Sequence, residues 1–426
     1  MLSSSADESF PSRSRSLNQP PVSRDSLPQI EEAAADSFPR EIVPLHSSRV
    51  FGLDLLRALA IAFVFIVHGL GPLKSHLPWW AGFLGHGGFY GVELFFVLSG
   101  FLIGTIIVRS GLKMQSASNV FVFYSRRWLR TLPLFFAILL LNVFLEPVLR
   151  DRTLAAADII RHGAFLANFS GFHMNFFGES WSLAVEEWFY LLFPAALWLS
   201  LRRTNRFDLA FVVVAMAFLL FSTGARVLSA QQLGATWFKA ERMVVIYRFD
   251  AIMIGVLSAW IAARAPAAWR KYATLCVILG SLASVVLYAS LWKVTNHDIT
   301  WSADSFFART FRFTFVSISF ALLLPAASRW KLQRENFVST SVRAIALWSY
   351  ALYLIHTPTI LLLQRYLPLA WQGSTLPATG MVLLEIALSL FLSALLYRYL
   401  ESPCTHLRDR ITPLRERPAP NAAVVV

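Results

Sequence analysis

Residues 53–69 read LDLLRALAIAFVFIVHG. This stretch is close to the length that an apolar helix needs to cross a lipid bilayer, about 20 residues. It nevertheless carries three ionisable side chains, Asp54, Arg57 and His68. A charged side chain at the centre of a membrane helix costs about 3 kcal/mol on insertion scales. We therefore expect these side chains to face a polar interior instead of lipid.

The composition of the whole chain is typical of a membrane protein. The chain has 426 residues, of which 56% are hydrophobic and 15% charged, and its mean hydropathy is +0.55. These values predict an all-α fold, a polytopic integral membrane protein with about ten transmembrane helices. The predicted helices cover residues 51–71, 87–108, 130–148, 183–200, 208–223, 246–263, 272–291, 306–327, 344–363 and 379–399.

The basic residues indicate a membrane topology. The net charge is +13, but Lys and Arg cluster at alternate ends of the apolar stretches, which argues against nucleic-acid binding. Under the positive-inside rule, both termini lie in the cytoplasm. We predict a disordered cytoplasmic N-terminal tail over residues 1–46, a membrane domain over 47–400 and a cytoplasmic C-terminal tail over 401–426. The two cysteines exclude a disulfide scaffold and a Cys-rich metal site, and we predict no bound metal.

Arg57 and His68 are predicted to share one face of the first helix. His68 follows Arg57 by eleven residues, which on a helix is within about 20° of three full turns and about 16 Å along the axis. Asp54 lies three residues before Arg57 and joins the same face. A purely structural role is one interpretation, in which Asp54 and Arg57 pair and His68 bonds a neighbour. Three ionisable groups on one face favour instead a path for substrate or protons.

The second apolar stretch, GGFYGVELFFVLSGFLIG (87–104), carries one carboxylate. Glu93 lies among Phe and Leu residues, so it needs a cationic partner. Gly100 and Gly104 form a small-xxx-small pair, which predicts close packing against another helix. Ser99, beside Gly100, is a further candidate for contact with substrate.

A cluster of arginines, FYSRRWLRTLP (123–133), precedes the third predicted helix. Arg126 and Arg127 lie four and three residues before Arg130, so one helix face can present two guanidinium groups. Arginine forks bind phosphate oxygens well. An ordinary membrane anchor on the cytoplasmic side is the alternative, and the spacing alone favours that anchor.

Two adjacent carboxylates occur in ESWSLAVEEWFYLLFP (179–194). Burying both Glu186 and Glu187 in an aromatic-rich helix is costly, so at least one should face the polar interior.

Three further ionisable residues lie at the outer ends of predicted helices. Arg248 and Asp250 lie in YRFDAIMIGVLSAW (247–260), and His356 lies in SYALYLIHTP (349–358), at the predicted depth of His68. Each of the three, taken alone, is more often structural than functional. No GxSxG elbow, Walker A loop, HExxH motif or CxxC pair is present, which argues against a serine hydrolase, a P-loop pump and a metalloprotease.

Together these segments resemble the acyltransferase family 3 membrane proteins, which include O-antigen, exopolysaccharide and Nod-factor O-acetyltransferases. The resemblance runs in the family's order over residues 50–400 or so, which makes the series specific. Leu55 departs from the family's usual Gly in LDGLRA, a change that affects local packing only. The matching segments are LDLLRALAIAFVFIVH with its Arg-x10-His spacing, YGVELFFVLSGFLI, the Arg-x-x-Arg of Arg127 and Arg130, WSLAVEEWFY, YRFDAIMIGVLSA and YALYLIHTP.

The resemblance implies an enzyme and its substrates. A family member takes an acetyl or related acyl group from cytoplasmic acyl-CoA, here acetyl-CoA, and transfers it to a sugar hydroxyl at the outer side. The resemblance also implies that Arg57 and His68 are essential and that Arg127 and Arg130 contact the coenzyme. The expected location is a bacterial inner membrane, with membrane lipid and a saccharide or glycolipid acceptor as partners. Transfer is expected to finish within the membrane domain.

A mechanism can be formulated from these residues. We expect His68 to act as general base, oriented by Glu93 or Glu187, with Arg57, Arg126, Arg127 and Arg130 binding the coenzyme. A covalent acyl-histidine remains an alternative to general-base catalysis. A transporter or flippase that lacks acyl chemistry, and a non-catalytic receptor or scaffold, are the alternative classes. The residues expected to contact or support substrate are Asp54, Ser99, Glu186, Arg248, Asp250 and His356.

Overall fold

The computed structural model describes residues 50–73, 87–174, 176–231, 241–295, 305–367 and 375–411. Within these ranges the regular secondary structure is entirely helical, which confirms the predicted all-α class. Eight described helices are long and apolar enough to cross a membrane. They establish a multi-pass membrane protein together with the hydropathy of the chain. The predicted tail over residues 1–46 lies outside the described residues.

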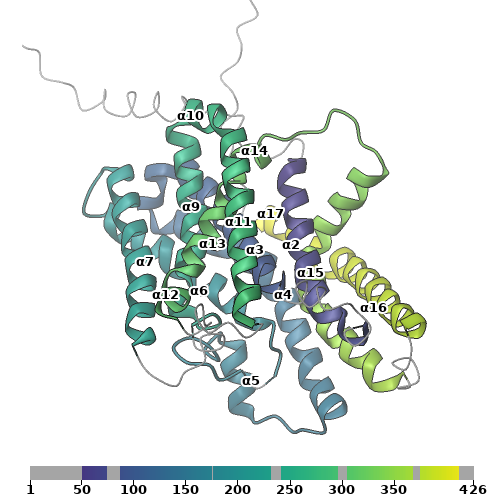
Figure 1. Cartoon of the computed structure of the whole chain (residues 1–426). Helices are drawn as coiled ribbons and strands as arrows, with labels where there is room; N and C mark the ends of the chain where they lie inside the picture. Colours follow the sequence, from purple (N-terminus) through teal and green to yellow (C-terminus); the bar gives the residue numbers. More distant parts are fainter. Residues whose placement is uncertain are drawn as a thin grey trace, which may run out of the picture. The chain divides into compact units, whose positions relative to one another are not determined.

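The helices follow the apolar stretches closely (Figure 1). The elements are α2 (Phe51–Gly69), α3 (Gly87–Ser110), α4 (Ala117–Arg150), α5 (Ala156–Gly163), α6 (Ser180–Leu201), α7 (Phe207–Ala230), α9 (Phe249–Arg264), α10 (Pro266–Lys271), α11 (Ala273–Thr295), α12 (Phe306–Thr310), α13 (Arg312–Ala321), α14 (Leu324–Ala327), α15 (Phe337–Tyr366), α16 (Thr375–Leu396), the π-helix Tyr397–Glu401 and α17 (Ser402–Ile411). Helices α5 and α10 lie at opposite ends of the other helices in Figure 1.

Two of the ten predicted membrane helices differ from expectation. Helix α9 has 16 residues, and the stretch 306–327 is divided into the short helices α12, α13 and α14. The first break follows Thr310, whose carbonyl accepts a hydrogen bond of 2.7 Å from Arg226 Nε. The second break precedes α14, which begins at Leu324 and has in its first turn Pro325, a residue without a backbone N–H. Helix α4 is longer than predicted, because its arginine-rich first turns are helical although they are not apolar.

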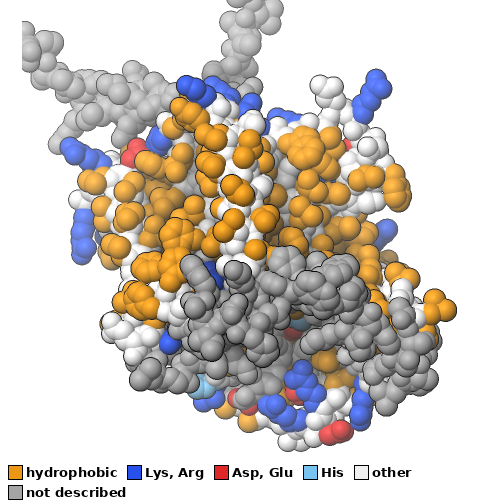
Figure 2. All heavy atoms as spheres, viewed as in Figure 1, with side chains coloured by type: hydrophobic (Ala, Val, Ile, Leu, Met, Phe, Trp, Pro, Cys, Tyr) orange, Lys and Arg blue, Asp and Glu red, His pale blue; other side chains and the backbone are white. Residues whose placement is uncertain are grey.

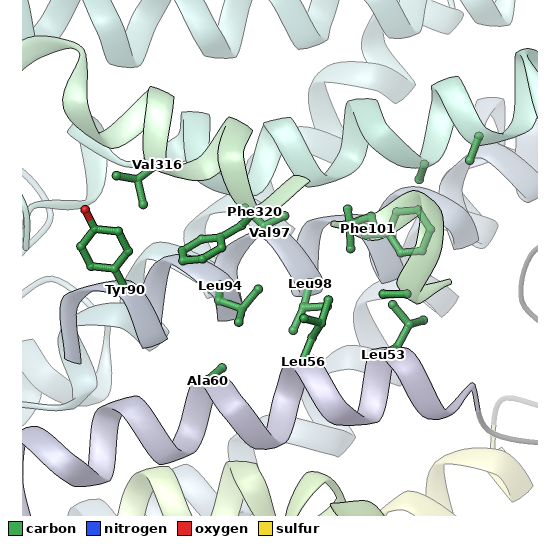
Figure 3. Packing of buried hydrophobic residues seen from close by; sticks show 14 of the residues in the cluster. Leu53, Leu56, Ala60, Tyr90, Leu94, Val97, Leu98, Phe101, Val316 and Phe320 are labelled. Atoms are coloured by element: carbon green, nitrogen blue, oxygen red, sulfur yellow. The ribbon is translucent and has the colours of Figure 1, made fainter. Parts of the chain in front are cut away.

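Close packing around α3 forms the core. Figure 3 shows Leu53, Leu56 and Ala60 of α2 facing Leu94 and Leu98 of α3. Val316 and Phe320 of α13 lie on the other side of α3 in the same view. The buried cluster therefore joins helices that are distant in the sequence.

The glycines of α3 allow it to approach α9. A Cβ atom on Gly100 would lie 2.0 Å from the carbonyl oxygen of Ile252, and one on Gly255 would lie 2.1 Å from that of Val97. At Gly104 the nearest atom, Cα of Val256, would be 2.8 Å away. The predicted small-residue contact is therefore confirmed, and its partner helix is α9.

The outer face of α11 is apolar and exposed. Figure 2 shows orange side chains over this helix and its neighbours. Such a continuous exposed apolar surface requires lipid in place of water. The exposed residues of α11 include Leu275, Ile278, Leu282, Val285 and Val286.

Buried ion pairs join the helices at the predicted outer half of the membrane. Arg226 of α7 donates two hydrogen bonds to the Asp250 carboxylate, at 2.9 and 2.8 Å, and both side chains are fully buried. Arg248 pairs with Glu93, and the other Glu93 oxygen accepts from Ser317 at 3.2 Å. Glu93 therefore has the cationic partner that its sequence environment required.

A third buried pair adds to this group of charges. Arg309 Nε donates to Glu241 Oε1 at 2.8 Å, and Ser229 Oγ donates to the same oxygen at 3.0 Å. These pairs satisfy charges that lipid cannot solvate, so they specify how α7, α9 and α12 meet.

Replacing Asp250 by Ala is expected to destabilise the protein by about 3–5 kcal/mol, because the buried Arg226 guanidinium loses its counter-charge. The loss should appear as a lower unfolding temperature in detergent. Asp208→Ala is the matched control, since Asp208 and Arg264 join the same two helices at 2.8 Å but are 51% and 38% exposed. The control should change stability by about 1 kcal/mol or less. Equal effects of the two substitutions would contradict the assignment.

Replacing Gly100 by Ala is expected to force α3 and α9 apart, at a cost of about 1–3 kcal/mol. Thermal unfolding and the yield of monodisperse protein in detergent measure this effect. Gly224→Ala is the control, because a Cβ atom there would meet nothing within 4 Å. A Gly100→Ala protein as stable as the Gly224→Ala protein would show that the close contact is not needed.

Candidate active site

Two histidines from helices far apart in the sequence meet at the end of α2. His68 Nδ1 lies 2.9 Å from Nε2 of His356, and the ring centroids are 5.0 Å apart. His356 is fully buried in α15, whereas His68 is exposed. Both histidines were candidates from the sequence, and the structure brings them into direct contact.

The hydrogen bonds of His356 define which nitrogen of His68 carries the hydrogen. His356 Nδ1 lies 3.1 Å from the Leu352 carbonyl, which can only accept, so Nδ1 carries the hydrogen. In a neutral imidazole, Nε2 is then the acceptor, and it faces His68 Nδ1 and the Thr357 hydroxyl, 3.3 Å away. His68 therefore donates from Nδ1, which leaves its Nε2 lone pair available as a base.

Neither carboxylate that was expected to orient His68 contacts it. Glu93 pairs with Arg248, and Glu187 Oε1 accepts a hydrogen bond of 2.7 Å from Thr131 Oγ1. The group that orients His68 in the structure is His356. Glu179, immediately before α6, is a carboxylate that interacts electrostatically with both histidines.

A cavity of about 130 Å³ lies between α2, α3, α4, α6 and α15. Arg57, Arg127 and Arg130 line one part of it together with Glu401 of the π-helix. Three guanidinium groups from two helices therefore converge on one space, as a polyanionic ligand requires. The remaining lining residues are Val92, Phe95, Phe96, Leu98, Ser99, Leu102, Thr131, Ser182, Leu183, Glu186, Ala346, Leu347, Ser349, Tyr350 and Tyr353.

The arginines of α4 have different surroundings. Arg126 pairs with Asp409 of α17 at 2.8 Å and is not among the residues that line the cavity. Arg127 stacks over the Tyr190 ring, with 4.5 Å from Cζ to the ring centroid. The structure therefore places Arg127 and Arg130, but not Arg126, at the cavity.

Ser99 and Glu186 form part of the cavity wall. Tyr190 donates to Glu186 Oε2 at 3.0 Å, and its hydroxyl lies 2.5 Å from Ser99 Oγ. This chain of hydrogen bonds holds the ring that supports Arg127.

The cavity extends toward the two histidines. Ser182 and Tyr353 line this part, and their hydroxyl oxygens are 2.6 Å apart. The Tyr353 ring centroid lies 6.1 Å from that of His356, one helical turn further along α15. The space that holds the arginines thus ends close to the histidine pair.

Three candidates have other surroundings. Asp54 is buried and lies 4.0 Å from the Arg57 guanidinium, within the same helix. Arg248 and Asp250 belong to the buried ion pairs described above and do not line the cavity.

The sequence analysis did not identify two residues near the site, Glu401 and Arg242. Glu401 follows the last apolar stretch. It is the last residue of the π-helix Tyr397–Glu401, and its side chain lines the cavity. π-Helices are frequent at functional sites, but local sequence does not reveal them. Arg242, between α7 and α9, interacts electrostatically with His68, and burial together with the nearby Arg248 lowers the pKa of Arg242 to about 10.

The described part of the chain contains no candidate metal site. Among the described residues, no group of three or more His, Cys, Asp or Glu side chains is placed to hold a metal ion.

Comparison with known proteins identifies relatives of the chain. It is 26% identical over 375 residues to the O-acetyltransferase OatA of Staphylococcus aureus strain NCTC 8325, which covers 83% of this chain and 56% of OatA. It is 24% identical over 392 residues to a protein of S. aureus strain COL whose name also describes an O-acetyltransferase, with 86% and 59% of the two chains covered. The chain thus spans little more than half the length of these relatives. No solved structure matches it.

The family comparison covers most of the chain. A model of the acyltransferase domain, family 3, matches residues 50–398, a range that contains the histidine pair and the arginines of the cavity. The match confirms the resemblance seen in the sequence motifs, and the chain belongs to acyltransferase family 3.

Proposed function

We propose that the protein is a membrane O-acyltransferase. It moves an acetyl or short acyl group from cytoplasmic acyl-CoA to a hydroxyl of an exported or lipid-linked saccharide. The observation that carries the proposal is the cavity that joins three arginines to the surroundings of the His68–His356 pair. The names of the S. aureus relatives support acetyl as the transferred group.

The arginines suit the donor. Acyl-CoA carries phosphate groups at one end of a long arm and a thioester at the other. Arg127 and Arg130 would bind phosphate oxygens by charge-assisted hydrogen bonds, and Arg57 would bind the arm or the diphosphate. The cavity then guides the arm along α2 toward the histidines, so that the thioester is delivered to His68.

The histidine pair suits the chemical step. The acceptor hydroxyl oxygen attacks the thioester carbonyl, and His68 Nε2 removes the hydroxyl proton. The C–O bond forms, the C–S bond breaks, and His68 returns the proton to the departing thiolate, which gives an ester and free coenzyme A. His356 holds the His68 ring and accepts from its Nδ1–H, so the imidazolium that forms is stabilised.

The oxyanion needs hydrogen-bond donors during this step. We assign this role to the hydroxyl groups of Ser182 and Tyr353, which line the part of the cavity nearest His356 along α15. These hydroxyl groups hydrogen-bond to each other and to the Glu179 carbonyl in the structure, and they turn to the oxyanion when it forms.

Membranes that contain the protein are expected to transfer label from acetyl-CoA, labelled in the acetyl group, to a saccharide fraction. His68→Ala should lower this rate by about 10²–10⁴-fold, because the general base is lost. His356→Ala should lower kcat to a value between those of the wild type and His68→Ala, with little change in KM, since His356 acts through His68. Correct insertion is checked by elution of each variant as a monodisperse species in detergent.

The same assay separates the alternatives. A transporter or flippase would bind or move a substrate without labelling any saccharide. A fully active His68→Ala protein would contradict the assignment of the base.

Arg130→Ala is expected to raise the KM for acetyl-CoA by about tenfold or more, since each hydrogen bond to a charged group contributes about 1.5–3 kcal/mol. Arg127→Ala should act in the same direction. Arg126→Ala is the matched control from the same helix, because Arg126 pairs with Asp409 outside the cavity lining. An equal rise in KM for all three variants would favour a general surface-charge effect over a built phosphate site.

A further inference from the structure

A second cavity, also of about 130 Å³, lies beside the histidine pair. It is formed by the C-terminal part of α4, the segment that precedes α6, and α15. Its polar lining residues are Asn142, Glu146, Arg150, Glu179 and Thr357, and Phe176 and Phe177 contribute aromatic rings. No step of the donor chemistry described above uses this space.

Glu179 and α15 connect the second cavity to the first. The Glu179 carbonyl oxygen lies 3.1 Å from the Tyr353 hydroxyl and 3.3 Å from that of Ser182, so it accepts from one of them while the other donates to its neighbour. Both residues line the first cavity, which we propose holds the acyl donor and call the donor cavity. Glu179 itself lines the second cavity. A single layer of hydrogen-bonded groups therefore separates the two spaces.

The histidine pair touches the same layer. Thr357 lines the second cavity, and its hydroxyl lies 3.3 Å from His356 Nε2, the nitrogen that also faces His68. A ligand in the second cavity would therefore lie next to the proposed base, one turn further along α15 than Tyr353.

The lining favours a ligand that donates hydrogen bonds. Glu146 is 5% exposed, and its Oε1 forms an ion pair with the half-exposed Arg150 guanidinium at 3.5 Å but accepts no hydrogen bond from the described residues. Asn142 Nδ2 donates to the Ile138 carbonyl at 2.9 Å, which leaves its Oδ1 as an acceptor. Buried carboxylate oxygens normally accept hydrogen bonds, so Glu146 Oε1 has capacity left to accept one from a ligand.

From these contacts we infer that the second cavity binds the acceptor and that Glu146 and Glu179 receive hydrogen bonds from its hydroxyl groups. The ligand class is a neutral, hydroxyl-rich saccharide unit, since carboxylate and amide oxygens accept from hydroxyls and aromatic rings pack against sugar C–H faces. The inference rests on the proposed function. It assigns acceptor recognition to residues of α4 and of the segment before α6, in a cavity separate from the one lined by the donor arginines.

Glu146→Gln tests this assignment, because it removes the charge but keeps the shape of the side chain. The assay uses membranes from the organism that encodes the chain, which supply the natural acceptor, and acetyl-CoA labelled in the acetyl group. Label in the saccharide fraction is expected to fall about tenfold, while the KM for acetyl-CoA and the release of free acetate to water stay unchanged. Leu361→Trp, which fills the same cavity with an apolar ring, should give the same pattern.

Glu385→Gln is the matched control. Glu385 is a fully buried carboxylate of α16 that accepts from Gln364 at 3.1 Å and lines neither cavity. Its substitution should leave saccharide labelling unchanged.

Three other outcomes overturn the inference. If both Glu146→Gln and Leu361→Trp label the saccharide fraction normally, the second cavity does not bind the acceptor. A raised KM for acetyl-CoA would assign Glu146 to the donor side. Failure of the wild-type protein to label any saccharide would reject the proposed function itself, and this outcome is distinct from a selective loss in the variants.

Discussion

A lipid bilayer provides no water to solvate a charge, and the arrangement of this protein's polar residues follows from that constraint. The charged side chains inside the helices are accommodated in two ways. Some are fully paired, as Arg226 is with Asp250 through two hydrogen bonds. Others line a cavity, as Arg127 and Arg130 do. The first group specifies how the helices assemble, and the second leaves room for a ligand.

Close packing around α3 makes this division possible. Because Gly100 and Gly255 remove two side chains, the backbones of α3 and α9 come into contact, and Glu93 of α3 reaches Arg248 at the start of α9. Along the length of α3, Ser99 is directed toward the donor cavity. One helix therefore contributes both to the buried ion pairs and to the candidate active site.

The histidine pair lies close to both cavities. His356 is fully buried, and its hydrogen bonds to Leu352 and His68 define the direction in which protons are donated. Donor-side residues reach it through Tyr353, and the second cavity reaches it through Thr357. For the acyl transfer that we propose, two separate cavities near His68 would let each substrate enter without displacing the other.

The sequence alone predicted the helical class, most of the membrane helices, the contact surface at Gly100 and Gly104, and the arginine and histidine candidates. These features depend on hydropathy and on helical periodicity, which are local properties of the chain. Which residue pairs with which was decided only by the tertiary structure. His68 meets a histidine 288 positions away, Glu93 an arginine 155 positions away, and Arg126 an aspartate 283 positions away. A local pattern shows that a buried charge needs a partner, but the partner is selected by the packing of the helices, which no single segment encodes.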